Sequence, residues 1–208
     1  MSILISGFGP FPGFAINPSQ KLVESLLAAP PAGVPLAGII LPVKYGEAPR
    51  LLLEKVAAVR PSAVVSFGVA TGSDDIRLER IGINWDESTV PDGTGDTPGG
   101  RRIAPDGPDG FFSTLPLARM LAALEGHELP ARISNSAGTY LCNHLMYCTL
   151  LALESGSGSG APPGAGGSTA IPAGFVHIPP AREWNPGPTA RPFAAIRGAA
   201  LRVLGELA

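Results

Sequence analysis

Cys142 is the residue whose surroundings point most directly to chemistry. It lies in the first turn of the helix expected over residues 140–154, where unpaired N–H groups and the positive end of the helix dipole favour the thiolate form of a cysteine. The preceding turn, residues 136–138, could present further N–H groups to a developing oxyanion. This pattern predicts a nucleophile. The alternative is a small buried hydrophobic residue, which is the commoner fate of a free cysteine.

A nucleophilic thiol needs a base, and the three histidines differ as candidates. His177 follows apolar residues near the end of an expected strand over residues 173–179, and the carboxyl edge of a parallel sheet commonly carries functional side chains. A core histidine bonded to backbone fits the same pattern. His144 points about 200° around the helix from Cys142, which favours a structural role. His127 lies in a polar turn, and we expect it to be solvated.

The third group that usually orients an imidazole base could be Glu79. It shares strand parity with Ile81 and Ile83 in the strand expected over residues 76–84, so its carboxylate would point inward. The alternation is imperfect, and an exposed Glu79 paired with Arg77 or Arg80 is the alternative. The sequence order alone does not bring these three segments together.

The two cysteines, Cys142 and Cys148, are predicted to remain unpaired. Six residues apart on one helix, their Cα atoms would be about 9 Å apart, beyond the roughly 7 Å that a disulfide tolerates. Neither cysteine has the spacing of a zinc site or a redox dithiol, so we expect no metal and a reducing compartment. Cys148 lies in mid-helix among apolar residues, and we expect it to be packed there.

The elements that must position these residues alternate between strands and helices, which is typical of an α/β domain with a largely parallel sheet. The expected strands are residues 2–6, 36–43, 62–68, 76–84, 131–138 and 173–179, and the expected helices are residues 17–29, 47–60, 115–126, 140–154 and 190–207. Residues 85–110 are rich in Gly, Pro and acidic side chains, which predicts a long irregular loop and a candidate lid.

Residues 155–170 contain only Ser, Gly, Ala, Pro and Thr, and we expect a flexible excursion there. The residues after it are too few to form a core of their own, so residues 1–208 are predicted to be a single domain. The chain has 15 Lys and Arg against 17 Asp and Glu, a formal net charge of −2, which argues against nucleic acid as a partner. No apolar stretch approaches the ~20 residues of a membrane span, and no leader pattern begins the sequence, which together predict a cytoplasmic protein.

Four segments together resemble the pyroglutamyl peptidase I family of cysteine peptidases. They are GFGPFPGFAINPS, ERIGINWDESTVPDGTGDTP, SNSAGTYLCNHLMY and GFVHIP, and they occur in the family's order. The resemblance implies an α/β/α sandwich with a mixed, mostly parallel, twisted sheet that hydrolyses N-terminal pyroglutamyl residues from peptides. It also implies that Cys142, His177 and Glu79 are catalytic, that neither a cofactor nor a metal is needed, and that the protein is a homo-oligomer, often a tetramer.

The family's substrate pocket corresponds to residues that are mostly apolar here. The resemblance implies a pyroglutamate pocket formed by Phe8, Phe11, Val43, Val69, Val90, Tyr140 and Leu141. Such a pocket suits a neutral lactam, whereas an ordinary aminopeptidase must pair an ammonium group with carboxylates. Core packing beneath a loop is the alternative for the two phenylalanines.

Three positions depart from the family pattern. Gly9 replaces an acidic residue, and Val69 replaces a glutamine that could contact the lactam. Thr89 replaces an arginine whose substrate or loop contact is either absent here or supplied elsewhere, by Arg101 or Arg102. These departures keep two alternatives open. One is a thiol amidase for a different small cyclic or terminal amide, and the other is a catalytically weak protein that binds pyroglutamyl ends.

Overall fold

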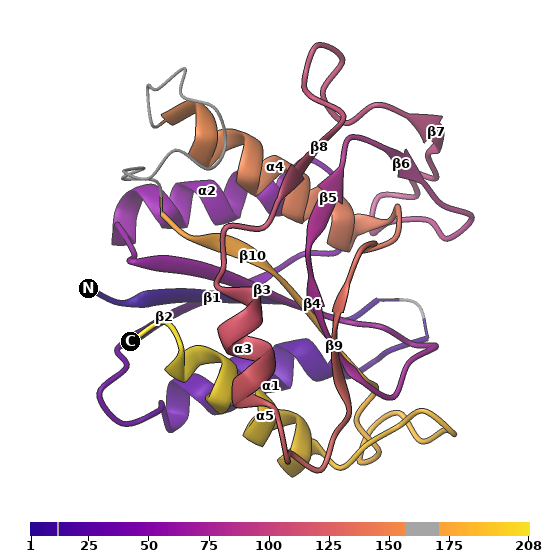
Figure 1. The fold of residues 1–208 in the computed structure, drawn as a ribbon. Coiled ribbons are helices and arrows are strands. Elements are labelled where there is room, and N and C mark those ends of the chain that lie inside the picture. The colour runs from indigo at the N-terminus through magenta and orange to yellow at the C-terminus, as the bar shows by residue number, and fades with distance from the viewer. Residues whose placement is uncertain (12, 157–170) are drawn as a thin grey trace.

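A six-stranded sheet with the strand order β2-β1-β3-β10-β4-β9 lies at the centre of the computed structural model (Figure 1). The structure describes residues 1–11, 13–156 and 171–208. The central strands are β1 (Ile3–Phe8), β2 (Leu36–Leu41), β3 (Ala63–Val69), β4 (Ile76–Glu79), β9 (Ala131–Ser134) and β10 (Ala173–Ile178). The helices are α1 (Pro18–Ala28), α2 (Glu47–Val59), α3 (Leu117–Ala123), α4 (Leu141–Gly156) and α5 (Phe193–Gly205).

The sheet is mixed and mostly parallel. β2, β1, β3 and β10 run parallel to one another, β4 runs antiparallel to β10, and β9 runs parallel to β4. β10 therefore has a parallel neighbour on one side and an antiparallel neighbour on the other. The reversal brings the last residue of β4 beside the middle of β10, where Glu79 pairs with Phe175.

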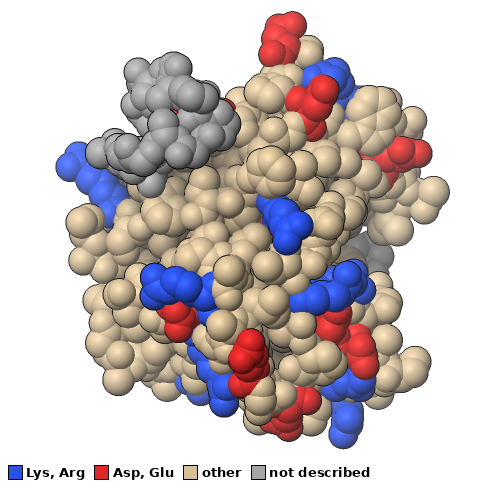
Figure 2. Space-filling view, viewed as in Figure 1, with Lys and Arg blue, Asp and Glu red and all other residues tan. Residues whose placement is uncertain are grey.

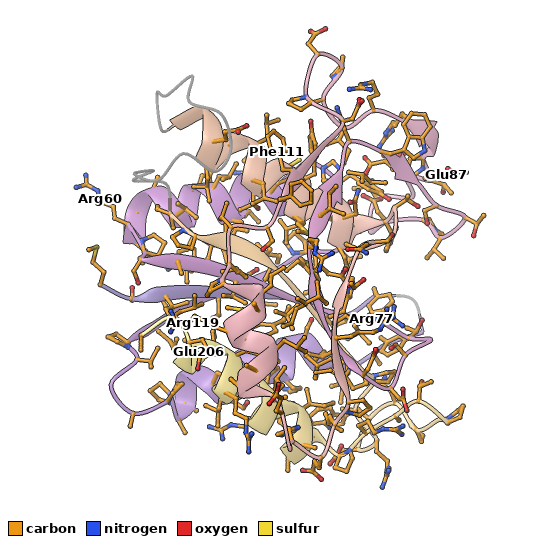
Figure 3. The ribbon with its side chains drawn as sticks, in the orientation of Figure 1. Arg60, Arg77, Glu87, Phe111, Arg119 and Glu206 are labelled. Carbon is orange, nitrogen blue, oxygen red and sulfur yellow. The ribbon has the colours of Figure 1, made fainter. Side chains whose placement is uncertain are left out.

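Helices cover both faces of this sheet, with α2 and α4 on one side and α1, α3 and α5 on the other (Figure 1). Alternate residues of the strands point to opposite faces of the sheet and pack into two separate hydrophobic cores, as the two-residue period of a strand requires. Ile3, Ile5 and Phe67 pack with α1, α3 and α5, whereas Leu4 and Val64 pack with α2 and α4. On the first side, Arg119 of α3 also pairs with Glu206 just after α5, at 3.1 Å (Figure 3). The predicted three-layer α/β/α fold is confirmed.

The strand expected over residues 76–84 is wrong in one respect, because it breaks at Arg80. β4 stays in the central sheet, whereas β5 (Ile81–Ile83) leaves it and pairs with β8 (Gly110–Phe112). The backbone of Arg80 accepts a hydrogen bond from the Ser113 N–H and donates one to the Ser134 carbonyl, so the chain turns there without losing its hydrogen bonds.

The prediction that residues 85–110 lack regular structure is also wrong. Two short strands, β6 (Asp86–Glu87) and β7 (Gly99–Arg101), pair antiparallel within this segment. The expected excursion over residues 155–170 begins inside α4, which continues to Gly156, and residues 157–170 lie outside the described part of the chain.

Charges of both signs are interspersed on the face of the molecule shown in Figure 2. This mixture accords with the formal net charge of −2 and gives that face no broad basic patch to hold a polyanion. Among the described residues, no helix is both long and apolar enough to span a bilayer.

Candidate active site

The antiparallel pairing of β10 and β4 brings His177 and Glu79 together. Phe175 pairs with Glu79 and His177 pairs with Arg77, so all four side chains lie on one face of the sheet. Glu79 and His177 are diagonal neighbours, which long side chains can bridge. His177 Nδ1 lies 2.8 Å from Glu79 Oε1, and both side chains are buried.

The alternative of a surface Glu79 is wrong. Arg77 pairs with Asp75, and Arg80 donates a hydrogen bond to Asn135, so both arginines are engaged elsewhere. Glu79 is fully buried, and its Oε1 has His177 as its partner. Glu79 Oε2 is buried without a hydrogen-bond partner among the described residues, so the carboxylate's strongest contact is with the imidazole.

Cys142 completes the cluster from α4, in the helical layer that covers this face of the sheet. It is the second residue of α4, it is half-buried, and its sulfur lies near enough to His177 to act on the charge of the imidazole. Burial by itself lowers the pKa of the His177 imidazole, but the adjacent Cys142 sulfur and the Glu79 carboxylate stabilise the protonated ring and raise its pKa to about 9. At neutral pH the imidazole is therefore protonated, as a thiolate–imidazolium pair requires.

Gly68 leaves the space that the Cys142 sulfur occupies. It lies on β3 directly beside His177 of β10. A Cβ atom at this position would lie 2.8 Å from Cys142 Sγ and 2.7 Å from Phe175 Cζ. Both distances are shorter than van der Waals contact, so a side chain here would displace the sulfur or the ring.

We predict that Gly68→Ala lowers hydrolytic activity by about 100-fold, since a shift of roughly 1 Å in a reacting group can cost that much. The measurement is the rate of amine release from a pyroglutamyl reporter amide, with thermal unfolding to show that the variant is folded. Gly72→Ala is the matched control, because nothing lies within 4 Å of its added Cβ. Equal activity of the two variants would contradict this account of Gly68.

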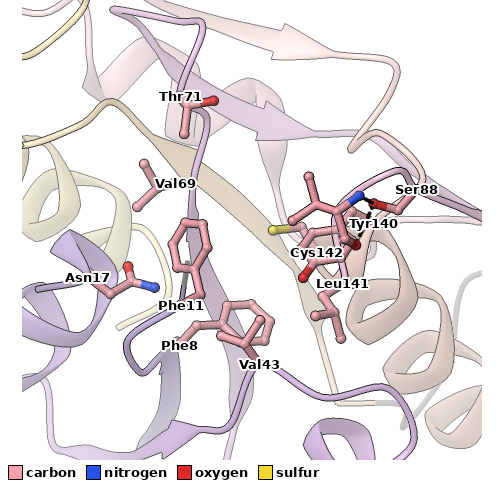
Figure 4. Close-up of a pocket in the computed structure, with 11 residues that line it drawn as sticks. Phe8, Phe11, Asn17, Val43, Val69, Thr71, Ser88, Tyr140, Leu141 and Cys142 are labelled. Atoms are coloured by element: carbon pink, nitrogen blue, oxygen red, sulfur yellow. Dashed lines mark hydrogen bonds between the residues drawn. The ribbon is translucent and has the colours of Figure 1, made fainter. Parts of the chain in front are cut away.

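A cavity of about 250 Å³ opens beside Cys142, and the cysteine sulfur points into it (Figure 4). Its wall contains all seven residues that the resemblance assigned to the substrate pocket, together with Asn17, Thr71 and Ser88, which the sequence analysis did not assign to it. The lining residues are Phe8, Phe11, Asn17, Val43, Val69, Thr71, Ser88, Val90, Tyr140, Leu141 and Cys142. The volume is below the ~300–1,000 Å³ of pockets for drug-sized ligands, so it fits a small group.

Asn17 holds the phenylalanine loop against α1. Its side-chain oxygen accepts a hydrogen bond from the Ser19 N–H at 3.0 Å, as expected of an N-cap, and its amide nitrogen donates to the Gly9 carbonyl at 2.9 Å. The second bond fixes the loop that follows Phe8, the last residue of β1, and carries Phe11. The N-cap role was readable from the Asn-Pro pair, but the bond to Gly9 depends on the path of the loop.

Asp92 fastens residues 85–110 to the rim of the cavity. Its carboxylate accepts hydrogen bonds from the backbone N–H groups of Tyr45, Thr94 and Asp96. Desolvation opposes ionisation of Asp92, but these bonds and the Thr94 hydroxyl outweigh it and lower its pKa to about 2. The Tyr140 hydroxyl also donates to the Pro91 carbonyl. These contacts make the segment a wall of the cavity.

Neither arginine that could replace the family's arginine at Thr89 is among the residues that line the cavity. Arg101 pairs with Asp96 at 2.5 Å and lies over the Tyr45 ring, and Arg102 pairs with Asp109 at 2.9 Å. Arg101 thus makes contacts within the loop, whereas a contact of either arginine with the substrate stays a prediction.

The other two histidines lie outside the cluster. His144 bonds to Asp86 at 2.8 Å, in line with a structural role. His127 was expected to be solvated, but it is half-buried and its Nδ1 accepts a hydrogen bond from the Leu129 N–H.

Comparison with known proteins agrees with this geometry. Residues 1–184 match the family model described as pyroglutamyl peptidase. The chain belongs to the pyroglutamyl peptidase family. It is 41% identical over 177 residues to the pyrrolidone-carboxylate peptidase of Oceanobacillus iheyensis, covering 85% of this chain and 83% of the relative. It is 37% identical over 190 residues to the enzyme of the same name from Streptomyces coelicolor, covering 90% and 82%.

Solved structures of the family share the fold. The pyroglutamyl peptidase I of Bacillus amyloliquefaciens matches with a TM-score of 0.87 at 27% identity, over 99% of this chain and 95% of that one. The pyrrolidone carboxyl peptidase of Pyrococcus furiosus matches with a TM-score of 0.88 at 28% identity, over 100% and 98%. Family membership places the chain among the cysteine-type peptidases.

Proposed function

We propose that this protein hydrolyses the amide bond after an N-terminal pyroglutamyl residue of a peptide, with Cys142 as nucleophile, His177 as acid and base, and Glu79 as the group that orients His177. The observation that carries the proposal is the meeting of these three side chains beside a small, mostly apolar cavity. Family membership supports the same reaction.

The reaction begins with the thiolate and imidazolium pair. The Cys142 sulfur attacks the pyroglutamyl carbonyl carbon, and backbone N–H groups at the start of α4 receive the oxyanion. Because Nδ1 of His177 faces Glu79, Nε2 delivers its proton to the leaving amine as the C–N bond breaks. His177 then takes a proton from water, the hydroxide attacks the thioester, and pyroglutamate leaves with the thiolate restored.

The lining of the cavity supports a lactam as the preferred group. The walls are largely aliphatic and aromatic, and no carboxylate lines the described part of the cavity. A free ammonium group would lose its hydration there without gaining an ionic partner, whereas a lactam ring offers methylenes and one amide. Phe8 and Phe11 can pack against the faces of such a ring.

The test is a panel of reporter amides of pyroglutamate, proline and glutamate. We expect the pyroglutamyl amide to be cleaved at least about 100-fold more efficiently in kcat/KM than either other substrate, since the unpaired ammonium costs several kcal/mol to bury. Preference for a different small amide would favour the thiol amidase. Measurable binding of a pyroglutamyl peptide without turnover would favour the weakly catalytic binding protein.

We also propose, from the resemblance, that the protein is a homotetramer. Its two free thiols fit a reducing compartment such as the cytoplasm, and the cytoplasmic location stays a prediction. Closure of residues 85–110 over the substrate likewise stays a prediction.

A further inference from the structure

His144 and Asp86 form a buried pair that the proposed mechanism does not use. His144 Nδ1 lies 2.8 Å from Asp86 Oδ2 and 3.1 Å from Asp86 Oδ1, and the two residues are 8% and 1% exposed. Because a carboxylate can only accept hydrogen bonds, Nδ1 carries a proton and donates a hydrogen bond to Asp86. Arg101 of β7 is farther away, with its Nε 4.0 Å from Asp86 Oδ2, so the imidazole is the closer partner of the carboxylate.

The pair fastens one wall of the cavity to α4. Asp86 begins β6, which lies beside the start of α4 (Figure 1). The next residue, Glu87, donates its N–H to the Thr139 carbonyl and accepts a hydrogen bond from the Thr139 hydroxyl at its own carbonyl. Ser88 and Val90, which follow directly along the chain, line the cavity. Together with the buried pair, these bonds hold this stretch of the wall against α4.

His144 also packs against the connection from β2 to α2. The Tyr45 ring lies edge-on to the imidazole, with 5.1 Å between the ring centroids, and edge-on to the Tyr140 ring at 5.9 Å. Tyr140 lies one helical turn before His144 and lines the cavity. The Gly46 N–H donates to His144 Nε2 at 3.5 Å, the outer limit of a hydrogen bond. The same connection supplies Val43 to the cavity, so the imidazole supports a second wall.

Three chain segments therefore meet at the His144 imidazole, and each of them carries residues of the cavity wall. The lining residues on these segments are Val43, Ser88, Val90, Tyr140, Leu141 and Cys142. Neither His144 nor Asp86 is among the residues that line the cavity, so the pair lies behind the wall. The distance between the walls depends on how these segments are held together, and in a small apolar cavity that distance decides which ring fits.

We propose that the His144–Asp86 pair sets the width of the acyl pocket and so determines its preference for a five-membered lactam over a larger ring. This inference rests on the proposed function. His144 and Asp86 are positioning residues, since they do not touch the substrate and act on it through the walls that they hold. The pair is a determinant of specificity rather than of the chemical step at Cys142.

The physical reason is the cost of a buried carboxylate that has lost its partner. Without the imidazole, Asp86 would keep its charge in a buried position with Arg101 no nearer than 4.0 Å, and removing one partner of a buried pair is strongly unfavourable. Movement of β6 toward water relieves that cost, because it hydrates the carboxylate. Ser88 and Val90 move with β6, so the cavity widens and the five-membered ring loses contacts with its walls.

The experiment measures kcat and KM for the reporter amides of pyroglutamate and of its six-membered homologue, 6-oxopiperidine-2-carboxylate. Wild type should prefer the smaller ring by about tenfold or more in kcat/KM, the usual discrimination for one methylene. His144→Leu fills the space but cannot bond to Asp86, and we expect it to reduce this preference at least about fivefold. The loss should lie mainly in KM for the pyroglutamyl amide, with kcat within about threefold. His144→Asn keeps a side-chain N–H near the position of Nδ1 and should recover most of the preference.

Asp109→Asn is the matched control, because it breaks an exposed pair with Arg102 in the same segment of the chain and should leave both constants unchanged. Thermal unfolding accompanies each variant. If His144→Leu does not fold, Asp86→Asn tests the pair from its other side, since the amide keeps the shape of the carboxylate without its charge, and we expect the preference to fall about threefold.

The outcomes separate this inference from the proposed function. A wild type that cleaves neither amide would refute the proposed function and this inference with it. A wild type that prefers the pyroglutamyl amide, with a folded His144→Leu or Asp86→Asn variant of equal preference, would overturn the inference alone. A KM effect of Asp109→Asn as large as that of His144→Leu would also overturn it, because the buried pair would then have no special role.

Discussion

Replacing Cys142 by serine should lower the hydrolysis of a pyroglutamyl reporter amide by at least about 10⁴-fold, because loss of the nucleophile removes the covalent route and leaves only the binding and oxyanion contributions. The sulfur points into the cavity and lies near enough to His177 to stabilise the protonated imidazole. A serine hydroxyl stays protonated at neutral pH, so the ion pair with the imidazole is lost. The measurement is amine release at saturating and subsaturating substrate.

Cys148→Ser is the matched control for this prediction. Cys148 is the other free cysteine, and it lies outside the cavity, so its replacement should keep the hydrolytic rate within about twofold. The Cys142→Ser variant should still bind a pyroglutamyl peptide, because the change from sulfur to oxygen leaves the apolar walls intact. Equal hydrolysis by wild type and Cys142→Ser would refute the assignment of the nucleophile.

Removing the imidazole with His177→Ala should lower kcat/KM by about 10³-fold or more, since general acid–base catalysis alone contributes about 10²–10⁴-fold and the thiolate also loses its counter-ion. His177 is buried between Glu79 and Cys142. Water therefore cannot easily replace it as the proton donor. The variant leaves a cavity in the core, and thermal unfolding must accompany the kinetics. His127→Ala removes a half-buried histidine on the far side of the sheet and should keep full activity.

The raised pKa of His177 predicts how the hydrolytic activity of the wild-type protein falls at alkaline pH. This pKa in the folded protein, about 9, lies above the ordinary value of 6.5, so the protonated pair persists through neutral pH. Activity should fall as the pH rises through about 9, when the leaving amine loses its proton donor. The stabilisation that protonated His177 gives the fold is likewise complete below pH 6.5 and is lost through about pH 9. A limb centred near pH 6.5 would contradict the stabilisation of the protonated imidazole by Cys142 and Glu79.

Much of the fold was predictable from local pattern. The helix that begins at Pro18 follows an Asn N-cap and a proline at its first position, signals that act within a few residues. The break at Arg80 was not predictable in this way. The apolar residues change parity between Leu78 and Ile81, but this imperfect alternation does not mark the end of a strand. The chain leaves the sheet there because Ser113 and Ser134, far along the sequence, bond to the Arg80 backbone. Non-local hydrogen bonds of that kind have no signature in the segment itself.

The residue types of the site could be predicted from the sequence, but the contact between their side chains could not. A thiol at a helix start and a histidine near a strand end are local facts, whereas the approach of Glu79 to His177 depends on β4 running antiparallel to β10. The inward parity argued for Glu79 was incomplete, because both faces of this sheet are covered and Leu78 is as buried as Glu79. Thr71 and Ser88 reach the cavity through loop paths that no periodicity describes.

The position of β10 has an evolutionary consequence. Its backbone is fixed on one side by β3 and on the other by β4, so the register of His177 is set by strands that precede the nucleophile in the chain. The number of residues joining α4 to β10 does not enter that register. Insertions and deletions between the cysteine and the histidine should therefore accumulate in lineages of this fold with little selection against them, while a one-residue slip within β10 itself would turn the imidazole to the opposite face and be eliminated.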